Sequence, residues 1–91
     1  MNDYLPSLRL SKRFTADLLD NRLTASERSA VKKSLELLDS NEHHPSLRIH
    51  RLEGDPEGSW TAYVTMKVRI TFRRDAGGLK QLLTLTKHYD R

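Results

Sequence analysis

The stretch Val68-Arg69-Ile70-Thr71-Phe72-Arg73 decides the fold, because apolar and polar side chains alternate along it without a break. A period of two predicts a β-strand with one buried face and one open face. The stretch Trp60-Thr61-Ala62-Tyr63-Val64 alternates in the same way. Turn-forming residues at 54–58 and 75–78 bound the two stretches, so the sequence predicts an antiparallel meander.

Two further strands extend the meander at its two ends. Residues 46–50 alternate between apolar and basic side chains, and residues 79–88 alternate between leucine and polar side chains. In the last strand Leu83 and Leu85 are predicted to share the apolar face, while Leu82 interrupts the alternation. The prediction is therefore four consecutive strands, each half-buried.

Two helices are predicted before the meander. A short strand at residues 6–10 leads to Ser11, a preferred N-cap residue, and to a helix over residues 12–20. The stretch Thr24-Ala25-Ser26-Glu27 is a capping box, which begins a second helix that ends near Asn41. The resulting order βααββββ predicts an α+β fold with both helices packed on one face of a twisted, mainly antiparallel sheet. At 91 residues, the chain is expected to be a single domain, residues 1–91.

Composition restricts the environment and the partners. The chain has 16 Lys and Arg against 12 Asp and Glu, a net charge of +4, and the basic excess lies in the second half. A basic surface attracts phosphates, so nucleic acid is the first partner to consider; a solvated basic surface is the alternative. The chain has no cysteine, no secretion signal and no apolar run of roughly 20 residues, so we expect a cytoplasmic protein that binds no membrane.

The open face of the predicted sheet carries side chains that suit an anionic ligand. Its expected members are Arg48, His50, Thr61, Tyr63, Arg69, Thr71, Arg73, Thr84, Thr86 and His88. Arginine offers two parallel donors to phosphate oxygens, and histidine exchanges protons near neutral pH. The face therefore fits a phosphodiester, with plain solvation of the arginines and threonines as the alternative.

The same face offers the groups that cleave RNA without metal. The 2′-hydroxyl attacks the adjacent phosphorus when a base, an acid and a stabilising cation are present. We assign His50 as the general base and Arg69 as the cation. The acid is either His88 or Lys87.

Binding of the RNA is assigned to four further residues: Arg48, Arg51, Tyr63 and Arg73. Arg48 and Arg73 are expected to hold flanking phosphates. Tyr63 stacks on a base or, as an equally open alternative, packs across the strands. No cofactor and no metal are expected, because the neighbours His43 and His44 fall short of the about four donors of a zinc site.

Four runs of this sequence, in order and with matching spacing, resemble the RelE/ParE toxin superfamily and in particular its YafQ-like branch. They are residues 44–54, 58–64, 68–73 and 84–88. The resemblance implies a βααββββ fold, a cognate antitoxin partner, and metal-independent cleavage of messenger RNA, commonly on the ribosome. It also matches His50, Arg69 and His88 to the histidines and the arginine of that branch.

The chain also differs from the YafQ-like pattern. It lacks an additional His and Asp between the middle strands, and it has Thr84 where those enzymes carry an arginine. Residues 86–91 replace a Gly-x-His-Asp run. Two rival functions stay open. A ParE-like gyrase inhibitor needs no proton-transfer groups, and a non-catalytic RNA-binding homologue would tolerate His50→Ala.

Overall fold

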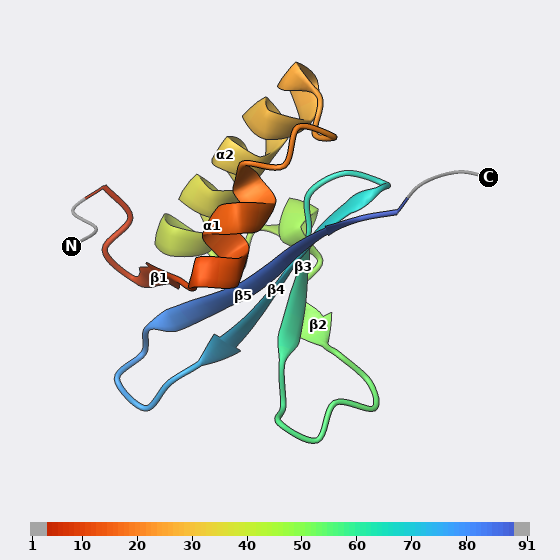
Figure 1. Cartoon of the computed structure of the whole chain (residues 1–91). Helices are drawn as coiled ribbons and strands as arrows, with labels where there is room; N and C mark the ends of the chain where they lie inside the picture. Colours follow the sequence, from red (N-terminus) through yellow and green to blue (C-terminus); the bar gives the residue numbers. More distant parts are fainter. Residues whose placement is uncertain (1–3, 89–91) are drawn as a thin grey trace.

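Two helices and five strands follow the predicted order. The computed structural model describes residues 4–88, so part of the C-terminal run at 86–91 lies outside the described residues. The elements are β1 (Leu8–Leu10), α1 (Lys12–Leu18), α2 (Ala25–Ser40), a 3₁₀ helix η1 (Pro45–Leu47), β2 (His50–Arg51), β3 (Trp60–Tyr63), β4 (Val68–Arg74) and β5 (Lys80–Lys87). Both helices lie on one side of the sheet (Figure 1). The predicted α+β architecture is confirmed.

The strands form one mixed sheet in the order β1-β5-β4-β3-β2. β1 runs parallel to β5, whereas the other three pairs are antiparallel. The edge strands are short, with three residues in β1 and two in β2. The meander β2 to β5 therefore carries most of the sheet, and its open face lies opposite the helices (Figure 1).

Local capping signals fix where the helices begin. Ser11 Oγ accepts a hydrogen bond from the Phe14 amide at 3.0 Å, as expected of an N-cap. Thr24 Oγ1 accepts from the Glu27 amide at 3.1 Å, and Glu27 Oε1 accepts from the Thr24 amide at 2.8 Å, which completes the predicted capping box. Arg28 Nη2 donates to the Asp20 carbonyl at 2.6 Å, so a side chain of α2 holds the chain that follows α1.

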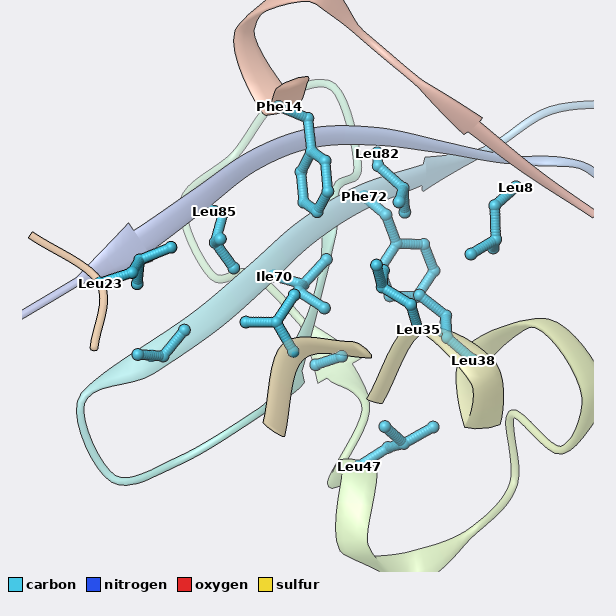
Figure 2. Close-up of a cluster of buried hydrophobic side chains, with 13 residues drawn as sticks. Leu8, Phe14, Leu23, Leu35, Leu38, Leu47, Ile70, Phe72, Leu82 and Leu85 are labelled. Atoms are coloured by element: carbon cyan, nitrogen blue, oxygen red, sulfur yellow. The ribbon is translucent and has the colours of Figure 1, made fainter. Parts of the chain in front are cut away.

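A single apolar core fills the space between the helices and the sheet (Figure 2). Phe14 of α1 and Phe72 of β4 are fully buried in it. The other buried apolar residues are Leu8, Leu23, Val31, Leu35, Leu38, Leu47, Ala62, Val68, Ile70, Leu82 and Leu85. Every second residue of β4 belongs to this set, as the alternation predicts. Within residues 4–88, no helix combines the length and apolarity that a bilayer crossing requires.

The prediction of a strand at residues 46–50 is wrong. Pro45 begins the 3₁₀ helix, and Arg48 follows it in the left-handed conformation, with φ 45° and ψ 46°. The strand is confined to His50–Arg51. Proline supplies no backbone donor and fixes φ near a helical value, so it favours the 3₁₀ turn over a strand here. The alternation that suggested a strand arises because the turn buries Leu47 and half-buries Ile49.

An irregularity in β5 explains the leucine that interrupted the alternation. Thr71 pairs with Thr84, whereas its neighbour Phe72 pairs with Leu82, so Leu83 is an extra residue on β5. Leu82 is fully buried and Leu83 is half-buried, which reverses the prediction for this pair. Beyond the bulge, the polar side chains of β5 return to the open face.

Candidate functional site

Strand register lines up polar side chains in two rows on the open face. One row is His50, Thr61, Thr71 and Thr84, and the other is Tyr63, Arg69 and Thr86. The rows cross adjacent strands, which are spaced about 4.8 Å apart. The predicted open face thus carries polar residues from the β2 edge to β5, and Thr61 is the buried member of the first row.

Two arginines of this surface pack against the ring of Tyr63. The guanidinium carbon of Arg48 lies 4.8 Å from the centre of the Tyr63 ring, and that of Arg69 lies 4.5 Å from it. Arg69 Nη1 also donates to the Val68 carbonyl at 3.1 Å and to the Thr65 carbonyl. Stacking on an aromatic ring orients a guanidinium and leaves its edge able to meet phosphate oxygens. Two positive charges are therefore held at one position of the sheet.

Arg48 also orients the predicted general base through its backbone. His50 Nδ1 lies 2.8 Å from the Arg48 carbonyl oxygen. A carbonyl only accepts, so Nδ1 carries the hydrogen, and in the neutral ring Nε2 keeps its lone pair. His50 is exposed, and its Nε2 therefore has the electronic form and the access that a general base needs.

His88 lies just past the end of β5. Its amide donates to the Lys67 carbonyl at 2.8 Å, which continues the pairing of β4 and β5 by one residue. By alternation it shares the face of Thr86, the partner of Arg69. Across the sheet, β2 therefore carries His50, β3 carries Tyr63 and β4 carries Arg69, and His88 follows β5. Three strand spacings, about 14 Å, separate the strands that carry the two histidines, and His88 lies four residues, about 13 Å, further along β5 than Thr84, which is in register with His50.

The remaining RNA-binding predictions fall in different places. Arg73 pairs with Glu57 of the β2–β3 loop, and its Nε is buried without a hydrogen-bond partner. Arg51 has the opposite orientation from its neighbour His50, and its guanidinium lies 5.4 Å from the centre of the Trp60 ring on the helix side. Arg73 thus borders the open face, whereas Arg51 does not belong to it.

The structure does not bring Lys87 to the open face. It follows the alternation of Leu85, so its Nζ lies on the helix side and donates to Glu27 Oε1 and to the Arg22 carbonyl, each at 2.8 Å. The hydrogen bond from Lys87, followed by that from the Thr24 amide, lowers the pKa of Glu27. Lys87 joins the capping box of α2 and is too far from the face to serve there as the acid, which corrects its assignment. His88 remains for that role.

Solved toxin structures match this chain over nearly its whole length. The RelE–RelB complex from Pyrococcus horikoshii gives a TM-score of 0.67 at 13% identity and covers 88% of this chain and 91% of that one. The DinJ–YafQ toxin–antitoxin complex from E. coli gives 0.70 at 19%, covering 89% and 90%. The YoeB/ParE toxin from Agrobacterium tumefaciens gives 0.71 at 18%, covering 91% and 99%. This chain has the fold of the RelE/ParE toxins.

The likeness is one of fold, because these identities are low. No family model and no curated protein sequence matches the chain. In a RelE-like fold the activity must be argued from the site itself. The register assigns His50, Tyr63 and Arg69 to one face of this sheet, and alternation extends that face to His88, which follows β5.

Sequence reasoning missed the backbone contribution of Arg48. Glycine or asparagine normally occupies a left-handed backbone position, whereas position 48 is an arginine. The sequence therefore did not indicate that the Arg48 carbonyl would contact His50. It also missed Arg74, whose guanidinium carbon lies 5.2 Å from the Trp60 ring centre. The Arg48 contact depends on the 3₁₀ turn at Pro45–Leu47, which the strand prediction excluded, whereas the Arg74 contact follows from the pairing of β3 and β4.

Proposed function

We propose that this chain is the toxin of a toxin–antitoxin pair, in the YafQ-like branch of the RelE/ParE superfamily, and that it cleaves messenger RNA without a metal ion. One observation carries the proposal. It is that, on a RelE-like fold, His50, the stacked pair Tyr63 and Arg69, and His88 just past β5 fall on one open face by register and alternation. A base and an acid on opposite sides of a cation are what in-line cleavage of a phosphodiester requires.

The reaction follows from this order. His50 Nε2 takes the proton of the 2′-hydroxyl, and the 2′-oxygen attacks the adjacent phosphorus. The bond to the 5′-oxygen breaks on the opposite side, where His88 donates a proton to the leaving group. Arg69 stabilises the negative charge of the phosphorane. The products are a 2′,3′-cyclic phosphate and a 5′-hydroxyl, so atoms and protons balance without any co-reactant.

The arginines beside the reacting groups bind the RNA strand. The guanidiniums of Arg48 and Arg69 both pack over the Tyr63 ring, so a phosphate beside the ring meets two positive charges. The exposed part of the Arg73 guanidinium, which pairs with Glu57, is a further donor for a flanking phosphate. The hydroxyl of Thr84 occupies the position where the resemblance calls for an arginine, so Arg69 carries the transition-state charge without that second cation.

The partners follow the same reasoning. Two of the matched structures, the RelE–RelB and DinJ–YafQ complexes, contain a second protein beside the toxin. A basic open face suits an acidic segment of an antitoxin that folds as it binds. Messenger RNA on the ribosome, in the cytoplasm, is the substrate we propose.

The test is cleavage of a defined messenger, both free and on programmed ribosomes, with new ends mapped by primer extension. We expect His50→Ala to lower the rate by about 10²- to 10⁴-fold, the usual contribution of one proton-transfer group. Arg69→Ala is expected to lose cleavage to a similar extent. Lys32→Ala removes an exposed charge on α2 and serves as the control that keeps full activity.

Two results would overturn the proposal. If the intact protein leaves both free and ribosome-bound messenger uncut, the enzyme reading fails, and inhibition of DNA supercoiling by gyrase becomes the assay to run. If the protein cuts and His50→Ala cuts equally well, the open face is not the catalytic centre. Cleavage only on ribosomes supports the proposal and identifies the ribosome as part of the substrate.

A further inference from the structure

A second basic surface lies around the edge of the sheet from the open face. It is a hollow of about 370 Å³ between the loop that follows α2 and the neighbouring ends of β3 and β4. The residues that matter in its lining are Glu42, His43, His44, Arg48, Trp60 and Arg74. None of the reacting groups assigned above lines it. Its size falls at the lower end of the range for small-ligand pockets.

Trp60 is the aromatic residue in the lining of this hollow. It is partly buried against the core, and the guanidinium carbons of Arg51 and Arg74 lie 5.4 and 5.2 Å from its ring centre. Both arginines are therefore held by an aromatic ring, the arrangement that orients Arg69 and Arg48 on the open face. Gly58 fits beside Arg51, because a Cβ at this glycine would meet the Arg51 guanidinium at 3.3 Å.

The carboxylate in the lining does not cancel this charge. Glu42 forms an ion pair with Arg74, and its other oxygen lies 3.6 Å from Lys80 Nζ. Burial raises the pKa of Glu42, but the hydrogen bond from Arg74 and the charges of Lys80 and Arg74 outweigh burial, so the pKa lies below its ordinary value. The three groups together carry one net positive charge, and Arg48, which also lines the hollow, adds another.

The hollow is continuous with the open face through Arg48. This residue lines the hollow and also places its guanidinium over Tyr63. The edge strand between the two surfaces is only two residues long, so little backbone separates them. A polyanionic chain that lies on the open face therefore meets arginine without interruption as it passes around the β2 edge.

We propose that this hollow binds a nucleotide of the RNA strand next to the cleaved one, with its phosphate between Arg74 and Arg48, the two arginines of the lining. The inference rests on the proposed function, because it extends the path of the same RNA. The volume suits one nucleotide and is too small for a helix of a protein partner, and a planar guanidinium can donate two parallel hydrogen bonds to a pair of phosphate oxygens. Messenger RNA is thus held at two surfaces, and only one of them reacts.

The single tryptophan of the chain makes this site directly observable. We would titrate the protein with 2′-O-methyl oligoribonucleotides, which cannot be cleaved, and follow Trp60 fluorescence. A hexamer is expected to change the fluorescence, whereas a dinucleotide that occupies only the open face leaves it unchanged. Arg74→Gln is expected to weaken hexamer binding roughly tenfold and to lower the salt slope by about one. The matched control is Arg13→Gln, an arginine of α1 paired with Asp17 at 3.1 Å.

The outcomes separate the two proposals. Anisotropy of a labelled hexamer measures binding independently of Trp60. If the hexamer binds and the Trp60 fluorescence does not change, the hollow is not a nucleotide site, and the proposal of RNA cleavage is unaffected. Equal losses in Arg74→Gln and Arg13→Gln also overturn it. If an acidic peptide, and no oligonucleotide, changes the fluorescence, the hollow is a protein-binding site and the inference is wrong. Should Arg74→Gln fail to fold, Glu42→Gln tests the same hollow with the opposite sign, because it removes the one carboxylate of the lining and is expected to strengthen hexamer binding.

Discussion

Arg48 is the residue that determines the chemistry of its neighbour. It is the one non-glycine residue among residues 4–88 with a positive φ, a conformation that costs an L-residue about 1–2 kcal/mol. Strain of this kind persists where the surroundings enforce it, and it often marks a functional site. Here the strained backbone directs the Arg48 carbonyl to His50 Nδ1.

The hydrogen bond to this carbonyl predicts the tautomer of His50. Neutral His50 is expected to carry its hydrogen on Nδ1 in the intact protein and in Arg48→Gly, because glycine adopts the left-handed conformation without strain. Arg48→Val disfavours that conformation, so we expect a mixture of tautomers. Two-bond ¹H–¹⁵N correlation spectra of the imidazole distinguish these states. A hydrogen on Nε2 of His50 in the intact protein would contradict the assignment.

The helix starts show which elements can be predicted from sequence. The caps at Ser11 and Thr24 were found because they satisfy neighbouring amides within three residues, and alternation found β3 and β4 because their partners are also alternating strands. The 3₁₀ turn and the bulge at Leu83 were missed. They depend on packing and on pairing between segments far apart in the sequence, and a short alternating stretch cannot report either.

The same reasoning applies to the site. Alternation placed Tyr63 and Arg69 correctly, since both lie in regular strands. The same alternation puts Lys87 and Arg51 on the helix side, where they contact Glu27 and Trp60, so their assignment to the site went against the strand pattern. Basic composition alone does not tell an RNA contact from a structural ion pair. The side of the sheet on which a basic residue lies decides between them.

Loss of the capping box should weaken α2 measurably. Thr24→Ala removes the acceptor for the Glu27 amide, and we expect it to lower the free energy of unfolding by about 1 kcal/mol. Ser29→Ala, an exposed change on the same helix, is the control and should leave stability unchanged or slightly raised. Urea denaturation followed by circular dichroism measures both. Equal stabilities for the two variants would show that the cap contributes nothing.

The connection between the helices should be sensitive to acid. Hydrogen bonds from the Arg22 side chain and amide lower the pKa of Asp20 from 3.8 to about 2. A lowered pKa means that the stabilisation is complete above the ordinary pKa and is lost as the pH falls toward the lowered one. The stability difference between the intact protein and Asp20→Asn should therefore be constant above about pH 5 and shrink toward about pH 2. A difference that does not change with pH would contradict this assignment.

Charge is segregated across the whole molecule. The carboxylates of Asp17, Asp20, Glu27 and Glu42 lie on the helix side, and each pairs with a cation there. The open face keeps His50, Arg69 and His88 among threonines, with no carboxylate in the two rows of side chains that cross it. Such a distribution orients an approaching polyanion toward the open face. The net charge of +4 matters less than this placement.

The central claim is that the 2′-hydroxyl of the RNA is the nucleophile, activated across this face. The most direct measurement is cleavage of a messenger that carries one 2′-deoxynucleotide at a mapped cut, beside a messenger with the same substitution one nucleotide away. We predict that the first substitution abolishes that cut and the second leaves it intact, with a 2′,3′-cyclic phosphate on the product. Cleavage at the 2′-deoxy position would show that another nucleophile acts, and the roles of His50 and His88 would be wrong.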